Sequence, residues 1–218
     1  MMPFSVEEFF AVFAAYNTAI WPLQIAAYVG GFAVVAMLWR PSRMADTGIF
    51  LVLSAMWVMN GIGYHWMHFA PVNPAARVFA ALFVVQAVLL AVAPLLSRER
   101  AVFGHAGSGV RWIAGALIVF AMILYPLLGF AFGHRYPAIP VFGVAPCPTT
   151  IFTIGVLLLG DWKTVRWLLI IPASWSVIGG SAAVLLAVPQ DYGLIAAGFI
   201  ALGIALAGRR LRANGTGA

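Results

Sequence analysis

Side chains able to bind a ligand or take part in catalysis gather in two stretches of an otherwise apolar sequence. The first stretch carries Asn60, Tyr64, His65, His68, Asn73 and Arg77. The second carries His134, Arg135, Tyr136, Cys147, Thr149 and Thr150. Hydroxyl, amide and imidazole groups hydrogen-bond small solutes, and arginine attracts anions. We therefore predict one ligand-binding site to which both stretches contribute.

A soft metal ion is a second kind of ligand that these stretches could bind. Thiolate, imidazole and thioether groups select Cu(I) and other soft ions, and these groups are present in His65, His68, Met67 and Cys147. The two arginines named above would repel a cation, so the anion and metal hypotheses compete. A soft transition metal is therefore one candidate cofactor, and the sequence leaves the choice of small molecule or ion open.

Two functions other than transport or solute binding also stay open. Cys147 could act as a nucleophile on a substrate dissolved in the membrane, with His65 or His134 as its base. In that hypothesis Cys147 and His65 are the candidate catalytic residues. Alternatively, the chain is a non-catalytic subunit of a membrane complex, or associates with copies of itself.

The composition indicates a membrane protein, because 64% of the residues are apolar and only 8% are charged, with a mean hydropathy of +1.02. Soluble domains carry about 25% charged residues. A helix that crosses the membrane needs about 20 apolar residues. Seven stretches approach or exceed this length, at residues 17–38, 46–68, 74–96, 110–132, 148–160, 164–188 and 192–208. Because they lack the alternation of membrane strands, we predict an all-α bundle of seven transmembrane helices, one domain over residues 17–208.

The basic residues are distributed unevenly between the two sides of this predicted bundle. The more basic side holds Arg40, Arg43, Arg98, Arg100, Arg111, Lys163, Arg166, Arg209, Arg210 and Arg212. The other side holds Arg77 and Arg135. Loops rich in lysine and arginine stay in the cytoplasm, which places the N-terminus outside and the C-terminus inside. The sequence pI of about 10.1 then reflects topology, so we expect membrane lipids and not nucleic acid as partners.

The two ends of the chain lie outside the predicted bundle. Ser5 and Glu8 have the spacing of a capping box, and the aromatic residues that follow suit an amphipathic helix on the membrane surface. We therefore predict an interfacial helix over residues 1–16. Residues 209–218 are expected to form a disordered cytoplasmic tail.

The fifth apolar stretch is the most informative for function, because it is too short to cross. Residues 148–160 would form about 20 Å of helix at 1.5 Å per residue. Pro148 suits the first helical position, which makes Cys147 the N-cap residue. A half-length helix would open its amino end, with free N–H groups, onto a hydrated pocket that faces outward. The alternative is a longer helix that begins near Val141 and is bent by its prolines.

Several known classes of membrane protein fit the sequence poorly. A retinal protein needs a lysine within a helix, but the one lysine, Lys163, lies in a predicted inner loop. Proton-coupled transport through a buried carboxylate is disfavoured, because all six acidic residues lie in predicted loops or at helix ends. Two histidines that share one helix, His65 and His68, suit haem ligation poorly.

Several motifs resemble those of an uncharacterised family of bacterial multi-pass inner-membrane proteins, a domain of unknown function. They include Tyr64-His65-Trp66, Asn73-Pro74, Gly133-His134-Arg135-Tyr136-Pro137, Pro146-Cys147-Pro148-Thr149-Thr150 and Gly179-Gly180-Ser181. The resemblance covers nearly the whole chain. It implies a multi-pass protein of the bacterial inner membrane, and it assigns no catalytic residue.

Overall fold

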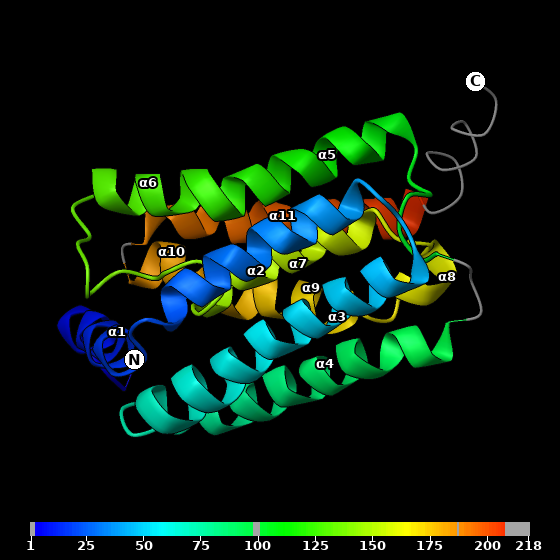
Figure 1. Cartoon of the computed structure of the whole chain (residues 1–218). Coiled ribbons are helices and arrows are strands. Elements are labelled where there is room, and N and C mark those ends of the chain that lie inside the picture. Colours follow the sequence, from blue (N-terminus) through cyan, green and yellow to red (C-terminus); the bar gives the residue numbers. More distant parts are fainter. Residues whose placement is uncertain (1–2, 98–100, 187, 208–218) are drawn as a thin grey trace.

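Helices make up all the regular structure that the computed structural model describes, which covers residues 3–97, 101–186 and 188–207 (Figure 1). Within these residues the one β-type contact is an isolated antiparallel bridge between Phe103 and Gly160. The all-helical fold agrees with the unbroken apolar runs of the sequence. The predicted tail, residues 209–218, lies outside the described residues.

Four helical stretches in the described part of the chain are long and apolar enough to cross a membrane. The first consists of α3 (Arg43–Val58) and the π-helix η1 (Met59–Phe69), and the second is α4 (Ala76–Leu96). The third consists of α5 (Ser108–Val119), η2 (Phe120–Leu124) and α6 (Tyr125–Ala131). The fourth consists of η4 (Pro189–Asp191) and α11 (Tyr192–Ala207). These lengths and compositions fit a membrane protein.

The remaining helices are shorter or bent. Helices α1 (Val6–Ala19) and α2 (Leu23–Leu38) meet at 85° and would count as a fifth crossing if taken together. Helix α7 (Pro146–Leu158) has 13 residues. The last apolar segment consists of α9 (Ile170–Ile178), η3 (Gly179–Ser181) and α10 (Ala182–Leu185), and it follows the four-residue helix α8 (Trp162–Val165). The structure thus contains four or five candidate crossings, and the predicted number of seven stays a prediction.

The first helices differ from the predicted boundaries. Helix α1 begins at the predicted capping box, where Ser5 Oγ accepts a hydrogen bond from Glu8 N at 3.1 Å and Ser5 N donates one to Glu8 Oε2 at 2.7 Å. It continues to Ala19, so Asn17 belongs to α1 and does not begin the next helix. The chain turns at residues 20–22 because Pro22 cannot continue the helical hydrogen bonds. Helix α1 therefore ends three residues beyond the predicted boundary between residues 16 and 17.

The predicted helix over residues 164–188 is broken into separate pieces. Helix α8 ends at Val165, and the regular helix resumes only at Ile170. The 3-10 turn at Gly179 and Gly180 then divides α9 from α10. Two adjacent glycines weaken a helix because they add backbone freedom without side-chain packing, which accounts for the second break.

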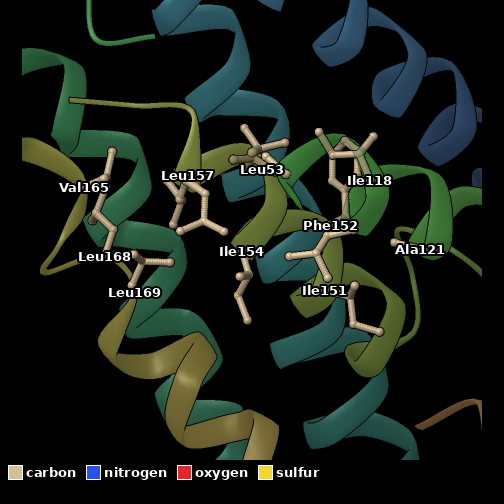
Figure 2. Close-up of a cluster of buried hydrophobic side chains, with 14 of the residues drawn as sticks. Leu53, Ile118, Ala121, Ile151, Phe152, Ile154, Leu157, Val165, Leu168 and Leu169 are labelled. Atoms are coloured by element: carbon tan, nitrogen blue, oxygen red, sulfur yellow. The ribbon is translucent and has the colours of Figure 1, made fainter. Parts of the chain in front are cut away.

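Helix α7 lies at the centre of the bundle, and every one of its residues except Cys147 is buried. It packs against α5, α9, α11 and α3. Its apolar side chains Ile151, Phe152, Ile154 and Leu157 lie among residues from α3, α5 and the segment before α9 (Figure 2). A helix that is apolar on all sides is one that the protein core can surround.

The threonines of α7 are buried without leaving their hydroxyl groups unpaired. Thr149, Thr150 and Thr153 each donate a hydrogen bond to the carbonyl oxygen four residues earlier, at 2.7–2.8 Å. Such bonds within the helix let threonine sit inside a membrane protein. Thr153 also accepts a hydrogen bond from Trp57 Nε1 of α3 at 2.9 Å. The Thr153 side chain therefore connects α7 to α3 by a hydrogen bond.

We expect Thr153→Val to destabilise the bundle by about 1–3 kcal/mol, because the indole N–H of Trp57 would be left buried without a partner. The measurement is thermal unfolding of the purified protein in detergent. Thr150→Val is the matched control, since Thr150 is equally buried and donates only to Pro146 O within the helix. Equal losses in the two variants would contradict a specific role for the Trp57–Thr153 bond.

Candidate functional site

A cavity of about 220 Å³ opens at the end of the bundle that α1 covers. Its walls come from α1, η1, the start of α4, the first turn of α7 and the α9–α10 segment. Most of these walls are aromatic or aliphatic side chains. The polar side chains among the lining residues are Tyr64, His65, Asn73, Cys147, Trp175 and Ser181. We call this space the His65 cavity.

Two buried polar side chains of this cavity have no hydrogen-bond partner. Both ring nitrogens of His65 are unpaired, and the indole Nε1 of Trp175 makes no hydrogen bond of normal geometry, although the Cys147 thiol lies near it. The two rings are in edge-to-face contact, with centroids 5.0 Å apart. His65 is 0% exposed and Trp175 6%, so a solute in the cavity reaches these nitrogens only after a covering ring moves. Unpaired buried polar groups are rare in native proteins and call for an explanation.

The π-helix η1 determines which residues face the cavity. Its wider turn is visible in the bond from Ala70 N to His65 O at 2.8 Å, which spans five residues. In an α-helix, residues three apart share a face, and this spacing predicted that His65 and His68 act together. In η1 they diverge: His65 packs against Phe83 and Trp175, whereas His68 packs against Tyr16 and its Nδ1 lies 2.7 Å from Gly63 O. π-Helical turns are frequent at functional sites.

Three of the predicted ligand-binding residues, Asn60, Thr149 and Thr150, lie inside the bundle, and two of them connect η1 to α7. Asn60 Nδ2 donates to Met56 O at 2.7 Å and also lies 3.3 Å from Thr149 Oγ1. The hydroxyls of Thr149 and Thr150 are bonded within α7. Asn60 and Thr149 thus hold η1 against the start of α7, and they position the cavity walls without lining the cavity.

The predicted positively charged residues lie apart from the His65 cavity. Arg77 is exposed and lines a separate surface pocket with Trp66 and Pro71. Arg135 stacks on the ring of Phe130 at 3.6 Å and donates to the carbonyl oxygen of that residue. An anion in the cavity would therefore lack the cationic partners that the sequence suggested.

His134 belongs to the loop that follows α6. Its ring stacks on Phe10 with centroids 4.5 Å apart, and its Nδ1 lies 3.3 Å from Gln190 Nε2. Partial burial lowers the pKa of this imidazole below its usual value. His134 therefore links α1 to η4 beside the cavity.

The four donors of the predicted soft-metal site do not form one cluster, although His65 and Cys147 both line the cavity. In the described residues, no group of three or more histidine, cysteine or acidic side chains is placed to hold a metal ion. Met67 is 62% exposed, and His68 diverges from His65 as described above. Of the four predicted metal donors, the structure brings only His65 and Cys147 to one cavity, so the metal site over His65, His68, Met67 and Cys147 stays a prediction without a matching cluster in the described residues.

The start of α7 also differs from the prediction. The helix begins at Pro146, with Ala145 as its N-cap, so Cys147 lies in the first turn and is not the N-cap residue. Because Pro146 and Pro148 have no N–H, this terminus offers few donors to an anion. The amide of Thr149 already donates to Ala145 O at 3.3 Å. The amino end of α7 is thus a wall of the cavity and a poor anion site.

The chain matches one family among known protein families. The model of a family of unknown function, DUF6064, matches residues 6–215. The chain belongs to this family. No curated protein and no solved structure matches the chain.

Two features of this DUF6064 chain, one in the cavity wall and one behind it, escaped prediction from the sequence. Trp175 was not singled out, because one of eight tryptophans in a membrane protein suggests an interfacial anchor. Asp191 was assigned to a helix end, which is correct, but it is only 1% exposed. Tyr125 Oη donates a hydrogen bond to Asp191 Oδ1 at 2.6 Å. No local sequence pattern signals this contact, since the two residues are 66 positions apart.

Proposed function

We propose that this chain is a solute-binding membrane protein, a transporter or a receptor, that takes a small neutral molecule into the His65 cavity. The molecule is mostly apolar and carries one hydrogen-bonding group. The observation that carries this proposal is the pair of unpaired polar side chains, His65 and Trp175, in the cavity wall.

The aromatic walls support a mostly apolar solute. Phe4, Phe9, Phe13 and Phe69 line the cavity, and flat apolar groups pack well on such rings. A hydroxyl or carbonyl group on the solute would satisfy the indole N–H of Trp175 and one nitrogen of His65. Binding pockets commonly combine apolar walls with a few such polar groups.

The same geometry disfavours the two charged ligands considered from the sequence. An anion would meet neither Arg77 nor Arg135, and the amino end of α7 offers it few N–H groups. A soft metal ion would find His65 without a second imidazole beside it. A neutral solute needs none of these partners, which is why we favour it.

We further propose that the chain lies in a bacterial inner membrane with seven crossings and the cavity facing outward. In this arrangement α2, α7 and the α9–α10 segment cross together with the four long stretches, and α1 lies at the membrane surface. The orientation rests on the basic residues: Arg43, Arg111 and Lys163 belong to α3, α5 and α8, which begin at the end of the bundle opposite α1 (Figure 1). A spheroplast labelling experiment on an exposed cysteine, introduced in α1 by Ala15→Cys in a Cys147→Ser background, would test this orientation.

The binding proposal is tested with three probes of similar shape and different polarity. These are 2-naphthol, 2-methylnaphthalene and the anion 2-naphthoate. Cys147 is the single cysteine of the chain and lines the cavity, so protection of its thiol from N-ethylmaleimide reports occupancy. We expect 2-naphthol to protect best, by about fivefold in affinity over 2-methylnaphthalene, because one hydrogen bond contributes about 1 kcal/mol. 2-Naphthoate should protect least.

His65→Phe is the variant that assigns this preference to the cavity wall. It should remove the advantage of 2-naphthol and leave the binding of 2-methylnaphthalene unchanged. It should also unfold at a temperature no lower than the wild type, because it removes two buried unpaired nitrogens. If 2-naphthol and 2-methylnaphthalene protect equally in the wild type, or if the preference survives in both His65→Phe and Trp175→Phe, the proposed function is wrong.

A further inference from the structure

A buried carboxyl group lies directly behind the wall of the His65 cavity. Asp191 belongs to η4, the turn that leads into α11, and only 1% of its surface is exposed. Its neighbour Tyr125 is the first residue of α6, which continues to Ala131. That is about 9 Å of helix at 1.5 Å per residue. The carboxyl therefore lies well inside the bundle, below the end that α1 covers.

Among the residues that the structure describes, the groups that surround Asp191 are polar and carry no positive charge. Tyr125 Oη donates to Asp191 Oδ1 at 2.6 Å, and the Cys147 side chain also interacts with the carboxyl group. Tyr64 of η1 is the third titratable group that acts on this cluster. Of the helices that pack on η4, α11 adds Tyr192, which is 56% exposed. Next to Asp191, Gln190 contacts His134 of the loop after α6.

An ionised carboxylate in these surroundings is strongly disfavoured, because no cation compensates the loss of its hydration. Intramembrane acidic side chains are rare and commonly serve ion or proton pathways. If Asp191 served only to hold Tyr125 in place, an amide or a hydroxyl group of similar size would make the same hydrogen bond. The carboxyl group can instead gain and lose a proton while Tyr125 holds it in place.

Cys147 connects this carboxyl group to the cavity. Its side chain lines the His65 cavity and also interacts with Asp191 and Tyr125. It is the one residue of α7 that is not fully buried. Cys147 is therefore a wall residue of the cavity that also interacts with Asp191.

We propose that Asp191, with Tyr125 and Cys147, is a proton-binding site coupled to the His65 cavity. The carboxylate takes one proton from water in the cavity and becomes a carboxylic acid, and release reverses this step without any other exchange of atoms. Occupation of the cavity moves Cys147 and changes the proton affinity of the carboxyl group. The existence of the proton site does not depend on the proposed solute, whereas its use in transport rests on the proposed function.

The test is infrared difference spectroscopy of the full chain in phosphatidylethanolamine and phosphatidylglycerol vesicles during a pH titration. We expect a carboxylic acid C=O band that changes with pH, is lost in Asp191→Asn and is retained in the exposed control Glu7→Gln. Tyr125→Phe keeps the carboxyl group but removes its hydrogen bond, so the same band should shift. A band that is present in Asp191→Asn, or that does not shift in Tyr125→Phe, refutes the proton site.

Coupling to the cavity is measured without any solute. Methyl methanethiosulfonate converts the Cys147 thiol to a methyl disulfide and releases methanesulfinate, and it adds no carbonyl group. We expect this reaction to shift the Asp191 band and its titration, and to have no effect on the band in Cys147→Ser. If the band keeps its position and its pH dependence after labelling, the coupling is refuted. Failure of solute binding to His65 would leave both infrared results unchanged, so the two proposals fail separately.

Discussion

Gly155→Leu is expected to prevent the bundle from packing, with a loss of stability of more than about 3 kcal/mol. Gly155 lies in α7 and faces α5. A Cβ atom at this position would lie 3.0 Å from the carbonyl oxygen of Ala114 and 3.0 Å from Ile118. Because backbone atoms of α5 cannot move aside as a side chain can, a leucine there must separate the two helices. The expected result is loss of the monodisperse peak in size-exclusion chromatography and of cooperative thermal unfolding.

Gly115→Leu is the matched control for this prediction. Gly115 lies on α5, next to Ala114, but a Cβ atom there meets nothing within 4 Å. The same substitution at the same depth should therefore leave folding almost unchanged. A stable Gly155→Leu protein, or equal damage from both variants, would mean that α7 is not the tightly enclosed centre of the bundle. Small residues at helix contacts are the usual means of close approach in membranes.

The parts of the fold that the sequence predicts are those fixed by local patterns. The capping box of Ser5 and Glu8 marks the start of α1, because both of its bonds lie within four residues. The length and apolar character of residues 74–96 likewise predict α4 closely. The family of unknown function expected from the motifs is confirmed by the match over residues 6–215. Each of these predictions depends on residues close together in the sequence and not on contacts between distant parts of the chain.

The errors arise where structure depends on distant residues. Asn17 was predicted to begin a helix, yet it is buried within α1 and donates from Nδ2 to Pro137 O at 2.7 Å and Ile139 O at 2.8 Å. That contact anchors the loop before α7, and it joins residues about 120 positions apart. Local polarity could not distinguish this anchor from a helix cap. The depth of Asp191 was missed for the same reason, since Tyr125 and Cys147 bury it from other helices.

The π-helix explains the error in the candidate site. With α-helical spacing, Asn60, Tyr64 and His68 share a face, and the sequence predicted that they line one pocket. In η1 these residues make different contacts: Asn60 contacts α7, Tyr64 lines the cavity and packs on Tyr16, and His68 also packs on Tyr16. The wider turn separates His65 from His68, which were expected to act together. Sequence periodicity does not distinguish a π-helix from an α-helix, because both give unbroken apolar runs. Of the residues predicted to bind a ligand, the His65 cavity brings together Tyr64, His65 and Asn73, and the other predicted residues lie elsewhere.

Ala182→Trp is expected to close the His65 cavity and to slow the alkylation of Cys147 on the order of tenfold or more, because thiol reactivity requires access. Ala182 is the first residue of α10 and lines the cavity. An indole ring at this position would fill much of the roughly 220 Å³ space between α10 and the first turn of α7. The measurement is the rate of N-ethylmaleimide labelling, followed by intact-protein mass spectrometry in detergent at fixed pH.

Val184→Trp provides the matched control, because Val184 lies on the same short helix but is 68% exposed. It should label at the wild-type rate. If Ala182→Trp also labels at that rate, the reagent reaches Cys147 by another route, and the cavity is not the path to Asp191 either. If both variants label slowly, α10 itself has been disturbed and a filled cavity is not the cause. Slow labelling in Ala182→Trp alone would show that the reagent reaches the Cys147 thiol through the His65 cavity. Access to the residue beside Asp191 would then run through this cavity.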